Sequence, residues 1–381
     1  MSSGSGQPLK VLIAGGGVAG LEAALALRDL AGDRVTTAML TPEPEFIPRP
    51  LRVREPFAGP AARHYALEDI ARDIGMELRQ DALKWLDPVG RIVHTEAGDE
   101  LTYDALLLAL GARLHSRFKH ALTLDDRHLD EQLHGIIQDV EAGYVHTLAF
   151  IAPGQMSWPL PLYELALMTA RRGYEMDEKV SVTLVTAEDA PLAVFGDAVS
   201  QAVAELLEEN GIRVISSTHA ETPEAGKVAL HPGGHTLDVD RIVALPELFG
   251  PSTPGVPKHD GHGFISIDVH CRVPGLDRVF AAGDATDFAV KHGGVASQQA
   301  DVAAEGIAAL AGAQIEPSRF HPEIHGMLLG GDKPLYLSAQ ITGTHGSRST
   351  ISDEPTWSPA TKIAAKYLAP YLEARDRVAA R

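Results

Sequence analysis

A glycine-rich turn near the N-terminus carries the first residues whose types and spacing could do chemistry. The turn, Gly15–Gly20, follows the apolar run 11–14 and precedes an Ala- and Leu-rich stretch. Between a buried strand and a helix, Gly15 allows a tight bend, Gly17 lets a pyrophosphate approach, and Gly20 lets the helix pack closely. The amides and dipole of the helix start would hold phosphate. The pattern predicts a dinucleotide site made of Gly15, Gly17, Val18, Ala19 and Gly20.

The acidic residue that normally binds the ribose about twenty residues later is displaced or absent. The next predicted strand, residues 35–40, is followed by Thr41-Pro42-Glu43. Either Glu43 reaches the ribose from the loop, or Thr41 replaces one of the hydrogen bonds. A solvated loop carboxylate is an equally good interpretation of Glu43.

A second candidate binding residue, Asp284, ends another apolar run. Residues 279–282 form that run, and Gly283-Asp284 follow directly. A carboxylate at the end of a buried strand suits hydrogen bonds from the hydroxyls of a sugar-like polyol. The alternative is a simple cap at the strand end.

The elements that would position these residues alternate along the chain, which predicts parallel sheets. Expected strands are 11–14, 35–40, 105–110, 147–151, 180–186, 213–216, 241–245, 264–267 and 279–282, and expected helices are 18–30, 160–172, 197–210 and 295–310. Hairpins are expected at 91–104 and around 232–234, an irregular proline-rich excursion at 41–60, and a linker at 246–257.

The predicted fold class is α/β, with two Rossmann-like, doubly wound, three-layer dinucleotide-binding domains. Residues 1–118 and 258–325 are expected to form the two parts of a discontinuous first dinucleotide-binding domain. Residues 119–257 are expected to form the second Rossmann-like unit, and 326–381 a short C-terminal interface segment.

The glycine turn, Gly283-Asp284 and the stretch Leu107–Ala112 together resemble the pyridine nucleotide-disulfide oxidoreductase superfamily of flavoproteins. The resemblance covers nearly the whole chain. It is closest to the branch that holds sulfide:quinone oxidoreductases, flavocytochrome c sulfide dehydrogenase flavoproteins and type II NADH dehydrogenases. It implies FAD as the cofactor, with residues 1–118 and 258–325 as the FAD-binding domain and 119–257 as an NAD-domain-like unit. It also places Asp284 on the ribityl chain of FAD.

Further FAD contacts are implied by two segments that resemble that branch. Phe46–Leu51 looks like its proline-containing loop close to the flavin, and Lys291–Gln299 looks like its segment beside the isoalloxazine ring. The helix starting there would stabilise reduced flavin through its amides. Lys291 would add charge, or is a surface lysine. The additional residues implied are Arg49, Pro50, Ala109, Gly111, Gly283, Lys291, Gly294 and Val295.

Two departures from the branch restrict the function. Sulfide oxidation there uses a pair of redox cysteines, and this chain has only Cys271, so orthodox sulfide:quinone activity is not expected. After the strand 147–151 only Gly154 remains of a second glycine fingerprint, which makes an ordinary nicotinamide site doubtful. Trp158 either forms the wall of a substrate pocket or packs in the core.

Composition excludes other function classes. The net charge of −18 over 381 residues opposes nonspecific nucleic-acid binding, and the single cysteine indicates a reducing, cytoplasmic setting. No signal segment and no long apolar run is present, so membrane contact would be peripheral, at the inner face. Segment 361–372 is predicted as a helix that packs on the body or a second subunit, or lies on a membrane. His115, His120, His128 and His134 lack metal-site spacing, and no metal is expected.

The leading prediction is an FAD-dependent oxidoreductase that passes electrons from a small donor to a quinone-like or other acceptor. No catalytic acid, base or nucleophile is assigned. One alternative is an NAD(P)H-dependent reductase of type II NADH dehydrogenase or ferredoxin reductase type. Another is a non-catalytic flavin-binding sensor or assembly subunit. The sequence does not decide whether the protein forms a homodimer.

Overall fold

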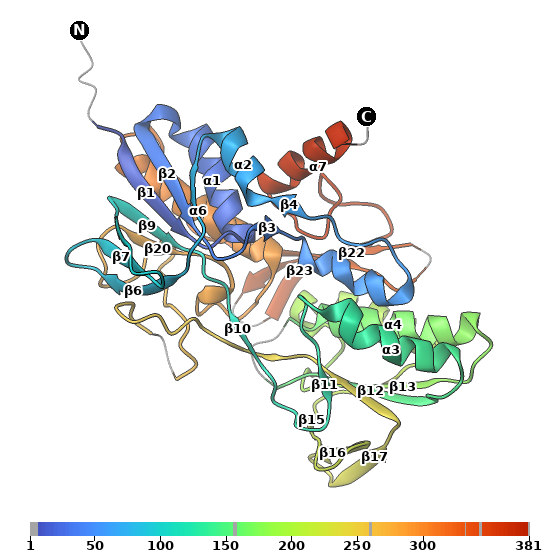
Figure 1. Cartoon of the computed structure of the whole chain (residues 1–381). Coiled ribbons are helices and arrows are strands. Elements are labelled where there is room, and N and C mark those ends of the chain that lie inside the picture. The colour runs from blue at the N-terminus through green and yellow to red at the C-terminus, as the bar shows by residue number, and fades with distance from the viewer. Residues whose placement is uncertain (1–6, 155–157, 259–260, 332, 343–344, 380–381) are drawn as a thin grey trace.

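A computed structural model describes residues 7–154, 158–258, 261–331, 333–342 and 345–379. Figure 1 shows a first sheet with its helices at the upper left, a second at the lower right, and the C-terminal strands between them. Gln155, Met156 and Ser157, part of the degenerate second fingerprint, lie outside the described residues.

The first sheet is parallel, in the order β20-β9-β1-β2-β5. Its members are β1 (Leu9–Ala14), β2 (Val35–Leu40), β5 (Glu77–Arg79), β9 (Ala105–Leu108) and β20 (Val279–Ala281), with helices α1 (Val18–Leu30), α2 (Leu67–Ile74) and α6 (Gly293–Leu310). Because β20 comes from far along the chain, the first sheet is built from two separate stretches of sequence. Helices α1 and α6 pack against each other, so their N-termini meet at one edge of the sheet.

The second sheet repeats this plan in the order β11-β18-β12-β13-β14, also parallel. Its members are β11 (Leu122–Thr123), β12 (Thr147–Ile151), β13 (Ser181–Val185), β14 (Arg213–Ile215) and β18 (Arg241–Ala244), with helices α3 (Leu129–Glu141), α4 (Leu160–Glu175) and α5 (Asp197–Glu209). Two Rossmann-like sheets therefore confirm the predicted fold class.

Small antiparallel sheets complete the two units. They contain β3 (Glu45–Phe46) with β4 (Tyr65–Ala66); β6 (Leu83–Asp87), β7 (Ile92–Thr95) and β8 (Glu100–Thr102); β10 (Arg113–His115) with β19 (Glu247–Phe249); β15 (His219–Glu221), β16 (Lys227–His231) and β17 (His235–Asp238); and β21 (Glu323–Leu328), β22 (Leu335–Thr342) and β23 (His345–Ser352). Short 3-10 turns lie at Gly32–Arg34, Arg49–Phe57, Ala193–Phe195 and Gly283–Ala285. The hairpins predicted at 91–104 and around 232–234 are present.

Several sequence predictions were wrong. The excursion 41–60 is not irregular throughout, because Arg49–Phe57 forms a 3-10 helix with proline in its first turn, where no amide bond is lost. The linker 246–257 contains β19, which pairs with β10. Of the expected strand 264–267 only a bridge from Ile265 to Thr286 forms.

The C-terminal helix starts later than predicted. It is α7 (Leu368–Ala379), so Pro370 lies in its first turn rather than interrupting it. The Glu22 carboxylate of α1 accepts hydrogen bonds from the amides of Tyr367 (2.9 Å) and Leu368 (2.5 Å) and so caps this start. Segment 361–372 packs on the first core through Ile363 and Leu368, in agreement with packing on the body.

The C-terminal part also reaches the second core. Strands β21 and β22 contribute Ile324 and Leu337 to the apolar cluster of Tyr163 and Phe195. Lys362 then places its Nζ 2.6 Å from both carboxylate oxygens of Glu164 on α4, and both side chains are buried. Residues after 320 thus fasten the two units to each other.

Candidate functional site

The predicted glycine turn has the geometry that its sequence requires. Gly15 adopts φ +121°, and a Cβ there would lie 2.1 Å from the carbonyl oxygen of Ala109 at the end of β9. A Cβ on Gly20 would lie 1.9 Å from the Gly15 carbonyl oxygen. Ala109 thus packs directly on the turn, and these glycines allow strand, turn and helix to approach each other closely.

The start of α1 is open for an anion. Gly17 is exposed, and a Cβ there would have no heavy atom within 4 Å among the described residues. The first backbone bond of the helix runs from the Leu21 amide to the Gly17 carbonyl, 3.0 Å, and no described side chain caps the helix. The amides of Val18, Ala19 and Gly20 therefore face outward with the positive end of the helix dipole, which fits a pyrophosphate.

Thr41 and Glu43 are placed differently. Thr41 is buried, and its Oγ1 lies 3.0 Å from the position of a Cβ on Gly16, so it adjoins the turn. Glu43 is about half exposed, and its nearest described cation is Arg127, 3.8 Å away. Of the two alternatives for a ribose contact, the structure brings only Thr41 against the glycine turn.

Asp284 follows β20 and Gly283, and so lies at the same edge of the first sheet as the glycine turn. Gly283 has φ +80°, and a Cβ there would lie 3.3 Å from the Ala19 Cβ of α1 and 3.4 Å from the Ala296 Cβ of α6. The glycine therefore lets both helix starts meet beside the carboxylate. Burial raises the pKa of Asp284, and nearby Lys291 and Arg49 act in the opposite direction.

Charged residues from three segments surround Asp284. Arg49, next to Pro50 in the 3-10 helix, places its Nη1 3.3 Å from the Oδ1 of Asp126. Lys291 is buried rather than on the surface; it donates to the Thr286 carbonyl and lies 3.9 Å from the centroid of the Phe264 ring. Asp126 was not predicted, because it follows a two-residue strand and belongs to no motif.

The start of α6 contains a neutral histidine. The Nδ1 of His292 accepts the Gly294 amide at 3.2 Å, and the ring lies 4.7 Å from that of Trp158. Burial, aided by His325 and Lys362, lowers the pKa of His292 to about 3. Val295 is buried in the second core, while Gly111 has open space where a Cβ would be. Trp158 is half-buried and packs on both Phe195 and His292.

The equivalent edge of the second sheet is filled by its own side chains. A Cβ on Gly154 would lie 2.7 Å from the His219 ring. Glu188, the acid that follows β13, accepts hydrogen bonds from the hydroxyls of Tyr163 (2.7 Å) and Thr186 (3.1 Å). Burial raises the pKa of Glu188. Its hydrogen-bonding capacity is largely used within the protein, which disfavours a ribose contact.

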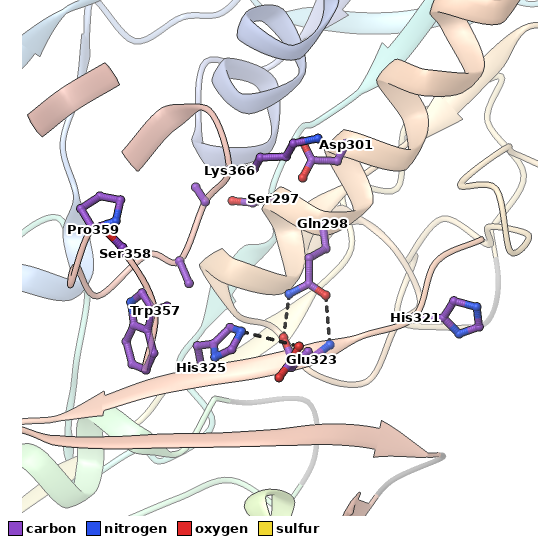
Figure 2. Close-up of a pocket in the computed structure, with 12 residues that line it drawn as sticks. Ser297, Gln298, Asp301, His321, Glu323, His325, Trp357, Ser358, Pro359 and Lys366 are labelled. Carbon is purple, nitrogen blue, oxygen red and sulfur yellow. Dashed lines mark hydrogen bonds and ion pairs between the residues drawn. The ribbon is translucent and has the colours of Figure 1, made fainter. Parts of the chain in front are cut away.

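A pocket of about 370 Å3 opens on the flank of α6, within about one turn of the helix start. Figure 2 shows how α6, β21 and the C-terminal segment enclose it. Two buried polar atoms of lining residues, the His325 Nδ1 and the Asp301 Oδ1, have no hydrogen-bond partner in the described part of the chain. Its polar and aromatic lining includes Ser297, Gln298, Asp301, His325, Trp357 and Lys366. Sequence patterns gave no signal for this pocket, because its walls are far apart in the chain.

Other reactive groups are few. Cys271 is buried, and its burial raises the pKa of the thiol, which opposes thiolate chemistry. Among the residues with defined positions, no group of three or more His, Cys, Asp or Glu side chains could hold a metal ion. No helix in the described ranges has the length and apolar character needed to cross a bilayer.

Comparisons with known proteins agree with this architecture. Residues 163–303 match the family model described as pyridine nucleotide-disulphide oxidoreductase. No curated protein matches the sequence.

Solved structures with the same fold include three oxidoreductases. The sulfide:quinone oxidoreductase from Aquifex aeolicus is 19% identical, with a TM-score of 0.80 over 97% of this chain and 90% of that one. A ferredoxin reductase from Rhodopseudomonas palustris is 22% identical, with a TM-score of 0.68 over 88% and 83% of the two chains. An NAD-dependent persulfide reductase from A. fulgidus is 19% identical, with a TM-score of 0.62 over 87% and 64%. The family match thus covers residues 163–303, and these solved structures share the fold of the two sheets.

Proposed function

We propose that the chain is an FAD-dependent oxidoreductase that passes electrons from a small donor to a quinone-like acceptor without a cysteine pair. The observation that carries the proposal is the open edge of the first sheet. There Gly283 lies against the start of α1, so the uncapped amides of this helix and the Asp284 carboxylate lie at the same edge. When bound, FAD supplies the electron-transfer chemistry.

The chain's own residues would bind and orient the cofactor. The α1 amides hold the pyrophosphate next to Gly17, and Asp284 accepts hydrogen bonds from the ribityl hydroxyls. Arg49 and Lys291 keep positive charge near that carboxylate, which favours its ionised form. The amides at Gly294 and Val295, at the positive end of α6, favour negative charge on the ring.

The electron donor is proposed to be something other than NAD(P)H. Tyr163 and His219 fill the second edge where a dinucleotide would lie, and Glu188 is held by Tyr163. The alternative of an NAD(P)H-dependent reductase is supported by the fold shared with an NAD-dependent persulfide reductase. The sensor alternative predicts bound FAD without turnover.

The pocket beside α6 is the proposed acceptor site. Ser297 lies four residues from the helix start that would face the flavin, about 6 Å along the axis. A small ring with polar oxygens would supply partners for the His325 Nδ1 and for a protonated Asp301, two of the groups at this wall. Its volume is within the range of small-molecule sites, about 300–1,000 Å3.

The test begins with the flavin content of the purified protein. Gly17→Ala adds a methyl that meets no described protein atom but stands where phosphate would approach, so it should lower FAD content at least tenfold without unfolding. Gly135→Ala in α3 also adds a methyl in open space and is the matched control. Wild-type protein that binds no FAD would overturn the proposal.

The second part identifies the donor and acceptor. Anaerobic mixing with NADH or NADPH should leave the flavin absorbance unchanged, whereas chemically reduced protein should be reoxidised by a short-chain benzoquinone. Rapid bleaching by NADH would instead establish the reductase alternative. Bound FAD that is not reoxidised by any acceptor would favour the sensor.

A further inference from the structure

Glu323 and His325 form a titratable pair in the wall of the pocket beside α6. They are separated by one residue in β21, so both side chains lie on the same face of the strand. The His325 Nε2 lies 3.9 Å from the Glu323 Oε2, and a dashed line marks this contact in Figure 2. Gln298 fixes the start of this strand, because its side-chain amide pairs with the Glu323 backbone at 2.6 and 3.0 Å.

The two side chains of the pair differ in their exposure to solvent. The Glu323 side chain is 47% exposed, whereas that of His325 is 19% exposed. The His325 ring packs 5.2 Å from the Trp357 ring, and its Nδ1 is the buried atom without a described partner. One ring nitrogen therefore faces a solvated carboxylate, and the other is a buried atom for which the described residues provide no partner.

Other titratable groups around the pair come from each element packed against the pocket. They are Asp301 on α6, His321 before β21, Lys366 in the C-terminal segment, and His292 at the start of α6. Burial lowers the pKa of His325, and Glu323 acts against this shift. A neutral imidazole with one protonated nitrogen can give a proton from one side and take one from the other.

We propose that His325 is the proton donor to the acceptor bound in this pocket and that Glu323 is the positioning residue that resupplies it from solvent. This inference rests on the proposed function. Reduction of a quinone to a hydroquinone takes two electrons and two protons. When bound and reduced, FAD would supply the two electrons and one of the protons. The second proton leaves the His325 Nδ1 for the quinone oxygen as the Nε2 takes one from solvent through Glu323.

The decisive experiment compares two acceptors of reduced holoenzyme by anaerobic stopped flow. A short-chain benzoquinone needs protons, whereas ferricyanide takes one electron and none. His325→Gln should slow reoxidation by benzoquinone about 100-fold and leave that by ferricyanide within twofold. Glu323→Gln should slow the benzoquinone reaction about tenfold and leave the ferricyanide reaction within twofold. His235→Gln, on the exposed strand β17, is the matched control and should change neither rate.

A second readout does not depend on turnover. In protein with isotopically labelled histidine, the His325 resonance, assigned through its loss in His325→Gln, should titrate at a lower pH in Glu323→Gln than in wild type. An unchanged titration would show that the two groups are not coupled and would overturn the role of Glu323.

The outcomes separate the two proposals. Wild-type protein that reduces no quinone would overturn the proposed acceptor class and this inference with it. Normal quinone reduction by His325→Gln would overturn only the proton donor. Equal loss with both acceptors would make His325 structural and would also overturn this inference.

Discussion

The two Rossmann-like sheets share a strand order but differ at the edge where a dinucleotide would bind. On the first sheet Gly17 leaves open space, and the α1 amides are uncapped by described side chains. On the second, His219 covers Gly154, and Tyr163 reaches Glu188. The same backbone plan can thus present a binding site or close it, depending on a few side chains at the strand ends. Fold alone does not predict two nucleotide sites.

Of the substitutions considered, one at the boundary between the two units should have the largest effect on stability. Lys362→Met leaves the Glu164 carboxylate fully buried, with the Leu329 amide as its remaining hydrogen-bond donor among the described residues, and should lower the free energy of unfolding by about 3–5 kcal/mol. Urea unfolding followed by circular dichroism would measure it.

Two control variants sharpen this test. Lys362→Met combined with Glu164→Met should recover most of the loss, because no buried charge remains. Arg377→Met, in an exposed pair with Glu373, should cost less than about 1 kcal/mol. A similar loss for all three would show that the buried pair has no special role.

Adding one methyl at each edge tests the comparison directly. Gly20→Ala places a Cβ 1.9 Å from a backbone oxygen, so α1 must move; we expect loss of bound FAD and about 1–3 kcal/mol of stability. Gly154→Ala meets the movable His219 ring instead and should change stability by less than about 0.5 kcal/mol, with normal FAD content. Flavin absorbance and unfolding would decide, and equal effects would contradict the difference between the edges.

The closed second edge should also depend on its internal hydrogen bonds. Tyr163→Phe removes one donor from the half-buried Glu188 and should cost about 1–2 kcal/mol. Tyr144→Phe, whose ring is exposed, is the control. We expect Tyr163→Phe to show no NADH binding by calorimetry, because the His219 ring still covers Gly154. Measurable NADH binding would show instead that the hydrogen bond from Tyr163 to Glu188 closes the edge.

The smallest effect is a pH dependence on the first unit. Burial, and then Glu22, raises the pKa of Asp301 to about 8 from an ordinary value of 3.8. Because the folded protein keeps this proton up to about pH 8 and the unfolded chain does not, its stabilisation is complete below pH 3.8 and is lost as the pH rises to about 8.

Asp301→Asn should therefore flatten the decline of Tm between pH 5 and 8 and raise Tm at pH 8 by about 1 °C. The exposed Asp33→Asn is the control. Parallel Tm curves for wild type and Asp301→Asn would show that Asp301 titrates normally.

Local patterns predicted much of the fold. The helix 18–30 and the strands 35–40 and 147–151 appear with the expected limits, because their apolar periods and flanking turns act over short distances. Helix α3 and the sheet β21–β23 were missed. The latter is stabilised by packing on residues such as Phe195, far along the chain, which no local pattern contains.

The candidate site was predicted only where a motif names it. Gly15 and Ala109, both named by the resemblance as cofactor contacts, lie against each other, and Gly283 before Asp284 lies beside the helix starts. The burial of Lys291 and the pairing of Asp126 with Arg49 depend on segments that fold together from distant parts of the sequence. The unpartnered nitrogen of His325 is likewise a property of three-dimensional packing.

Glu22 and Glu164, which bind the C-terminal segment, set the order in which the two units can complete their folding during synthesis. Glu22 and Glu164 belong to helices that leave the ribosome early, but their partners Leu368 and Lys362 leave it more than 190 residues later. Until then each helix carries a buried-type carboxylate without its final partner. The two units therefore reach full stability only after residues 362–368 have been synthesised, and the edge that would bind FAD can be filled before this segment packs into place.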